Sequence, residues 1–214
     1  MKRTLVAATA LSLVITLASC GDNDEDPAPS SSPSPDVSST TPSAPATATR
    51  EPDGPPADWE REFTPTELAA GKAALARWTQ WRQLSSQIYK QGRFTPGAEA
   101  TLKEYDFWWQ RNIRTLSETY DKGGLRRVSD VEPLWAYVKS VRLAANGETG
   151  EVRIVECTDY EPLRYERNGQ PQEIKKPKHL VTPLLITMTK PDAEHDWMYY
   201  ETKLKDKTSC AAQQ

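Results

Sequence analysis

The chain has 214 residues, of which 37% are hydrophobic and 27% charged, and its formal net charge at pH 7 is −3. Residues 59–214 are themselves nearly neutral, so the composition gives no electrostatic case for nucleic-acid binding. Two histidines and three cysteines without ligand-type spacing give no support for a metal site. The sequence predicts no cofactor, and its length suits one folded domain with additional segments.

The first nineteen residues have the order of an export signal. Lys2 and Arg3 precede a mainly apolar run over residues 5–17, and the small residues Ala18 and Ser19 follow. The apolar run is shorter than the roughly 20 residues that a permanent transmembrane helix needs. We therefore expect residues 1–19 to be removed as a signal peptide. An ordinary secretory signal with a chance cysteine near the cleavage site is the alternative.

The residues around the expected cleavage site, Leu17-Ala18-Ser19-Cys20, resemble the lipobox of bacterial lipoproteins. That resemblance implies that Cys20 receives a diacylglyceryl group and becomes the mature N-terminus. Two acyl chains hold a protein on a membrane, whereas one chain gives only reversible attachment. We predict a protein anchored by its N-terminal lipid to the extracytoplasmic face of the cell membrane.

Residues 20–58 differ in composition from the rest of the chain. They hold nine of the 17 prolines, together with many Ser, Thr, Ala and Asp residues and almost no large apolar side chains. Such a segment buries too little apolar surface to offset the entropy cost of ordering. We expect a disordered linker that spaces a folded domain, residues 59–214, from the membrane.

Two amphipathic helices are predicted at the start of the domain. Thr64 is placed to cap the first helix, Glu67 to complete a capping box and Gly92 to end it. The second helix starts at Thr95, and its apolar residues keep a spacing of three or four up to Tyr120.

After Gly124 the pattern changes to short β-rich runs separated by turn residues. The runs are residues 128–131, 135–145, 151–159, 163–166, 179–189 and 197–204. The Asn-Gly pairs at 146–147 and 168–169 predict tight hairpin turns, and Pro183 predicts a bulge or an edge strand. Helices followed by consecutive strands predict an α+β fold, with the helices packed on one face of a curved, largely antiparallel sheet.

The cysteines bear on the redox state of the domain. If Cys20 carries lipid, Cys157 and Cys210 are the two remaining thiols. An exported protein meets an oxidising compartment, so we predict a disulfide between them. Two free cysteines are the alternative.

The order of these features resembles actinobacterial lipoproteins with a nuclear transport factor 2-like domain. The likeness extends over residues 64–210. It rests on helices followed by a hairpin, the strand Val155-Glu156-Cys157-Thr158-Asp159, an Asn-Gly turn, Trp197 in the last strand and the late Cys210. The resemblance implies a cone, in which a curved sheet wraps helices and leaves a pocket at its open end. Such domains often have three helices, so the third is short, near Asp121, or absent.

Cone folds of this family include isomerases and dehydratases, which use an Asp or His as general base and a Tyr or second acid as proton donor. The available groups are Asp106, Asp159, His195, Tyr105, Tyr160 and Tyr165. Asp159 is better explained as a turn cap or a partner of Arg153, and His195 as a solvated loop residue. The sequence therefore assigns no catalytic residue.

Most of the seven tryptophans are expected in the core, because large aromatic side chains provide much of the burial between helices and sheet. Trp108 and Trp109 are adjacent and cannot face the same side of a helix, so one of them is expected to line a pocket or an interface. Trp108, Tyr105 and Asp159 are the predicted pocket or interface residues.

The leading functional hypothesis is a non-catalytic, lipid-anchored envelope protein that binds a small apolar ligand or another envelope protein. The alternative is an exported isomerase-like or dehydratase-like enzyme that acts on a small apolar substrate in the cone. A buried acid with a raised pKa beside a proton donor favours the enzyme, whereas an apolar or occluded pocket favours binding.

Overall fold

A computed structural model of the chain describes residues 54–205 and Cys210. The predicted signal peptide 1–19, the predicted lipidation site Cys20 and nearly all of the predicted linker 20–58 lie outside the described residues. None of the helices in the described part of the chain is long and apolar enough to cross a membrane.

The helical elements come first in the described chain. They are η1 (Trp59–Glu62), α1 (Pro65–Gln91), α2 (Pro96–Tyr105), α3 (Trp109–Thr115) and the π-helical turn η2 (Leu116–Asp121). The predicted capping box of α1 is confirmed, because the Thr64 hydroxyl accepts from the Glu67 N–H at 3.4 Å and the Glu67 carboxylate accepts from the Thr64 N–H at 3.0 Å. Gly92 ends α1 with φ 61°, a conformation that glycine adopts without a Cβ clash.

The second predicted helix is not continuous, and the sequence expectation is wrong at this point. The side chain of Asp106 accepts from the Trp108 N–H at 2.8 Å and from the Asn112 side-chain amide at 2.5 Å. An Asp side chain that binds nearby backbone N–H groups competes with helix continuation. The chain therefore ends α2, turns, and starts the short α3, which continues into η2 and ends at Asp121. The expectation of a third helix that is short and near Asp121, or absent, is therefore met by a short third helix.

Seven strands follow within the described residues. They are β1 (Leu125–Ser129), β2 (Glu132–Leu143), β3 (Gly150–Asp159), β4 (Arg164–Arg167), β5 (Gln170–Gln172), β6 (Val181–Lys190) and β7 (Met198–Leu204). They form a four-stranded sheet of order β2-β3-β6-β7 and a three-stranded sheet of order β1-β4-β5, both antiparallel. Three helices and two antiparallel sheets confirm the predicted α+β class.

The predicted turns and the predicted position of Pro183 have different outcomes. Asn168 and Gly169 join β4 to β5 with φ values of 52° and 79°, which confirms the tight turn. The prediction for Pro183 is wrong on both counts: β6 lies between β3 and β7, so it is not an edge strand, and the β3–β6 register runs through Pro183 without a bulge. Its carbonyl accepts from the Lys205 N–H at 3.1 Å, and the β6–β7 register starts at Leu184. Proline has no N–H to donate, and at Pro183 this side of the backbone faces the end of β7. No hydrogen bond between paired residues of β6 and β7 is therefore lost.

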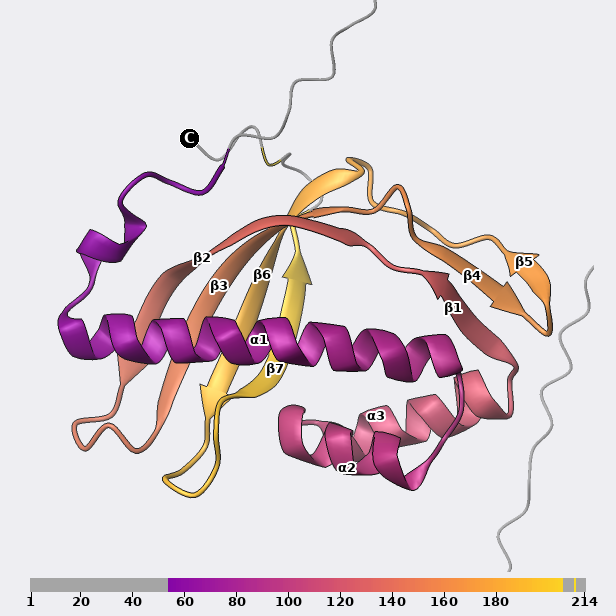
Figure 1. Cartoon of the computed structure of the whole chain (residues 1–214), viewed down its shortest axis with the longest axis horizontal. Coiled ribbons are helices and arrows are strands. Elements are labelled where there is room, and N and C mark those ends of the chain that lie inside the picture. Colours follow the sequence, from indigo (N-terminus) through magenta and orange to yellow (C-terminus); the bar gives the residue numbers. More distant parts are fainter. Residues whose placement is uncertain (1–53, 206–209, 211–214) are drawn as a thin grey trace, which may run out of the picture. The chain divides into compact units, whose positions relative to one another are not determined.

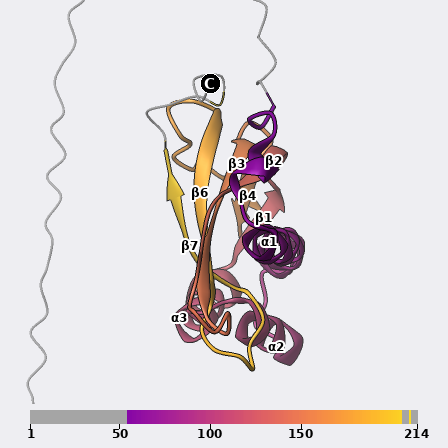
Figure 2. The ribbon, with the colours of Figure 1, turned by 90° about the vertical axis from the view of Figure 1, so that its left-hand side faces the viewer.

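Helix α1 lies across one face of the four-stranded sheet (Figures 1 and 2). Gly71 permits this approach, because a Cβ at that position would lie 3.1 Å from a methyl group of Val138 on β2. The core between the layers includes Trp78, Trp81 and Ile186, which are at most 7% exposed. Burying each such side chain stabilises the fold by roughly 1.5–3 kcal/mol.

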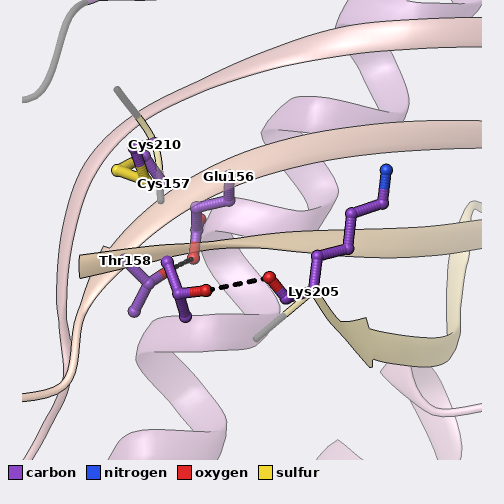
Figure 3. Close-up of a disulfide and its surroundings, with 6 residues drawn as sticks. Glu156, Cys157, Thr158, Lys205 and Cys210 are labelled. Atoms are coloured by element: carbon purple, nitrogen blue, oxygen red, sulfur yellow. Dashed lines mark hydrogen bonds between the residues drawn. A yellow bond between two sulfur atoms is a disulfide. The ribbon is translucent and has the colours of Figure 1, made fainter. Parts of the chain in front are cut away.

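Cys157 on β3 and Cys210 lie in disulfide contact, with their Cα atoms 5.9 Å apart (Figure 3). The structure is therefore compatible with the pairing predicted from the sequence. The bond attaches Cys210 to an inner strand of the four-stranded sheet.

We predict that Cys210→Ser lowers the free energy of unfolding by about 4 kcal/mol, because the disulfide closes a loop with a sequence separation of 53 residues. Urea denaturation of the wild type, the reduced wild type and the variant measures the loss. The reduced wild type and the variant should coincide, and the variant should not respond to reductant. A wild-type midpoint that reductant leaves unchanged would contradict the prediction.

Candidate functional site

A pocket of about 490 Å³ lies between α1 and the strands. Helix α1 contributes Trp78, Trp81 and Tyr89 to its wall, and β6 and β7 contribute Leu184 and Tyr199. The polar part of the lining comes from α1, the α2–α3 region, the β1–β2 region and β3, and includes Arg82, Asp106, Asn112, Arg127, Asp130 and Glu156. The volume is within the range of small-molecule sites, which are mostly apolar with a few placed polar groups.

Glu156 is a buried acid in this pocket, with 2% of its surface exposed. One carboxylate oxygen accepts from the Trp78 indole N–H at 2.8 Å and from the Arg82 guanidinium at 2.9 Å. The other accepts from the Thr158 hydroxyl at 3.2 Å. Burial raises the pKa of Glu156, and the Arg82 charge and the two neutral donors offset part of that rise.

Asp106 is a second buried acid in the lining and is fully inaccessible to solvent. Burial raises the pKa of Asp106, while the hydrogen bonds from Asn112 and Trp108 and the charge of Arg111 act in the opposite direction. Both oxygens of Asp106 therefore already have donors, and those bonds hold the turn between α2 and α3.

Arg127 is at the centre of a polar cluster beside the two acids. Its guanidinium lies 3.2 Å from Asp130 and 3.2 Å from the Tyr165 hydroxyl, and 5.1 Å from the centre of the Tyr89 ring. Asp130 also accepts from Lys90 at 2.5 Å. Burial raises the pKa of Tyr89 to about 12, so its phenol stays protonated and is available to donate.

The three residues predicted for a pocket or an interface lie outside this pocket. Tyr105 stacks on Trp81 with ring centres 6.2 Å apart and lies under the Arg77 guanidinium at 3.5 Å. Asp159 ends β3 and accepts from the Glu161 N–H at 2.8 Å, so it is a turn cap, as the sequence indicated. Trp108 is 39% exposed and lies in a surface cluster of rings. None of the three lines the pocket.

The remaining candidate groups are also separate from one another. His195 is exposed, with its Nδ1 atom 2.7 Å from Asp192 in the loop before β7. Burial raises the pKa of Tyr160 to about 12, and Tyr165 belongs to the Arg127 cluster. Among residues 54–205 and 210, no group of three side chains could hold a metal ion.

The sequence singled out some of the residues that line the pocket and not others. Asp106 was among the acids considered for catalysis, but Glu156 and Arg127 were not. A local signal for Glu156 exists, because it is a charged residue inside the strand Val155-Glu156-Cys157, whose neighbours are apolar. A charged residue in a buried strand needs partners from another element, and it therefore marks a site worth testing.

Comparisons with known proteins give little guidance for this chain. No protein-family model matches it, and neither does any curated protein sequence. Among solved structures, the crystal structure of the intermembrane space region of chloroplast protein ARC6 is similar at a TM-score of 0.43 and 14% identity. The similarity covers 63% of this chain and 95% of that one. A TM-score at this level supports no conclusion about function.

We predict that Glu156→Gln becomes more stable relative to the wild type as the pH rises from 4.5, the ordinary pKa of glutamate. Since the folded-state pKa is raised, the folded wild type binds the proton more tightly than the unfolded chain does. Wild-type stability is therefore lost as the pH rises from 4.5 through the folded-state value. Glutamine does not titrate and avoids that loss.

Urea midpoints of both proteins, measured from pH 4 to pH 8, test this expectation. The difference between variant and wild type isolates position 156, because the other titrating groups are common to both proteins. A difference that falls with rising pH, or stays constant, would show that burial does not dominate the titration of Glu156.

Proposed function

We propose that the chain is a lipoprotein, anchored through Cys20 to the extracytoplasmic face of the cell membrane, whose domain binds a small molecule without transforming it. The ligand occupies the pocket between α1 and the four-stranded sheet. Ligand binding is inferred from the pocket, which has the volume of a small-molecule site. The absence of catalysis is inferred from its two buried acids, which already accept hydrogen bonds from the protein, and the anchor from the lipobox-like residues before Cys20.

The same proposal assigns the domain to the nuclear transport factor 2-like cones. Three helices precede the strands, α1 lies against an antiparallel sheet, and the pocket lies between these layers. This arrangement agrees with the features that the resemblance implies. The sequence resemblance supports the fold assignment. The chemical nature of the ligand is inferred from the residues that line the pocket.

The lining favours a mainly apolar ligand with a few polar groups. The rings of Trp78 and Trp81 both pack on the Tyr199 ring, with centres 5.7 and 6.0 Å away, and the three offer an apolar wall. The Tyr89 phenol and the Arg127 cluster supply donors at another part of the wall. Apolar walls provide affinity, and placed polar groups fix orientation.

An exported isomerase or dehydratase is the second candidate, because burial raises the pKa of both Asp106 and Glu156. Acids of this kind beside a protonated phenol such as Tyr89 are the components of acid–base catalysis. Against this, Glu156 accepts from three donors and Asp106 from two. A base held in this way must break a hydrogen bond before it can take a proton from a substrate.

For the anchor, we predict that Cys20→Ala abolishes the diacylglyceryl mass increment and moves the protein out of the membrane fraction, because the thiol that receives the lipid is gone. Fractionation and intact-mass measurement of full-length wild type and variant provide the test. The matched control is Ser19→Ala, which keeps a small residue before the cysteine. Normal amounts of unlipidated Cys20→Ala in the membrane fraction would refute the anchor.

For the pocket, we predict that full-length protein from the cells that make it carries a non-covalent small molecule in native mass spectrometry. Ser85→Phe should lose it, because Ser85 is a half-buried α1 residue of the lining and the new ring fills the space. Gln87→Phe is the matched control, because Gln87 is exposed on the same helix. Equal loss in both variants, or no adduct in the wild type, would contradict ligand binding here.

The recovered molecule also separates binding from catalysis. A binding protein yields the same molecule from the wild type and from Glu156→Gln. A dehydratase yields product from the wild type and hydrated substrate from the variant, and an isomerase yields two isomers that differ in retention time. Either of these differences would replace the binding proposal with the enzyme.

A further inference from the structure

Phe107, Trp108 and Tyr200 form a cluster of rings on the surface, which we call the aromatic patch. Their ring centres are 5.1, 5.3 and 5.5 Å apart, and Phe107 and Trp108 are 38% and 39% exposed. The Phe107 N–H donates to the Tyr199 carbonyl at 2.9 Å, which holds the α2–α3 turn against β7. The patch is therefore a fixed feature at the junction of two elements.

Two arginines of α3 lie beside the patch. Arg111 and Arg114 are three residues apart, so they share one side of the helix, and the Arg111 guanidinium is 5.6 Å from the centre of the Trp108 indole. Among the described residues neither forms an ion pair, in contrast to Arg82 and Arg127. Asp106 interacts with Arg111 only at longer range.

The nearby acid does not neutralise these arginines. Glu201 borders the same surface, but it is paired with Lys203 at 2.7 Å. Neither arginine is therefore held in an ion pair by the described part of the chain, and both guanidinium groups are available to an anionic partner.

The surface is also hollowed at Trp108. One hollow of about 360 Å³ is bordered by Phe107, Gln110 and Arg114, and another of about 380 Å³ by Tyr199 and Tyr200. Trp108 and Arg111 border both of them. A partner can therefore place side chains in either hollow while its charged groups meet the arginines.

A membrane surface explains these features less well than a protein does. Two arginines near an anionic bilayer contribute about 1 kcal/mol each, and a bilayer surface needs no hollows. Trp, Tyr and Arg are the residues enriched at the energetic centres of protein interfaces. We propose that the aromatic patch with Arg111 and Arg114 docks a protein partner that presents an acidic segment carrying an apolar side chain.

This docking site goes beyond the proposed ligand function and does not depend on it. Arg111 borders both the ligand pocket and the patch, so the tests use Gln110, Arg114 and Trp108, which line the hollows but not the pocket. Loss of docking with the pocket ligand retained, or the reverse, keeps the two proposals distinguishable.

Site-specific photo-crosslinking in the cells that make the protein tests the docking site. The full-length chain carries p-benzoylphenylalanine at Gln110, between Trp108 and Arg111, or at the exposed Gln87 of α1 as the control position. We expect a protein adduct at position 110 and none at position 87. Peptide mapping should place the crosslink in an Asp/Glu-rich segment of one identified protein.

Charge and ring variants complete the test. Arg114→Glu and Trp108→Ala should each reduce the adduct about tenfold, whereas Arg93→Glu, an exposed arginine outside the patch, should leave it unchanged. Arg114→Gln serves in place of Arg114→Glu if the urea midpoint of the latter falls. An adduct with phospholipid, with a second copy of this chain or with no partner at all would overturn the proposal. So would a protein adduct that is insensitive to the charge at position 114.

Discussion

The position of α1 on the sheet depends on the contact between this helix and Glu156 of β3. Trp78 and Arg82, one turn apart on α1, donate to the same carboxylate oxygen at 2.8 and 2.9 Å. Apolar packing between the layers contributes more free energy, but it is non-directional and does not by itself select one placement of the helix. Charge-assisted hydrogen bonds with fixed geometry do select one.

The same contact explains why a mainly apolar pocket with buried polar groups in its lining exists beside a packed core. A buried carboxylate is strongly destabilising without partners, and removing one partner of a buried pair costs roughly 3–5 kcal/mol. The carboxylate therefore keeps its donors on α1, and those donors hold the aromatic wall of Trp78, Trp81 and Tyr199 in place. Pocket shape and fold stability therefore depend on one set of bonds.

The sequence predicted the features that depend on neighbours in the chain. The structure has four such local features: the capping box at Thr64, the glycine end of α1, the Asn168-Gly169 turn and the order of helices before strands.

The break at Asp106 was missed because the apolar stripe of the predicted helix continues across it. Strand β5 was missed because its three residues are all exposed. The pocket was missed because Glu156, Arg82 and Arg127 meet through pairings between distant segments. The expectation that adjacent Trp108 and Trp109 face different sides is met, since Trp109 packs on the core and Trp108 lies on the surface, while an interface role for Trp108 stays a prediction.

A crystal structure of the protein purified from the cells that make it tests the central claim most directly, namely that the space between α1 and the sheet is a ligand site. The account predicts continuous non-protein density in contact with Trp78 and Tyr199, with the Glu156 hydrogen bonds to Trp78 and Arg82 intact. A pocket closed by the protein's own side chains, or one in which Glu156 has left those donors, would contradict it.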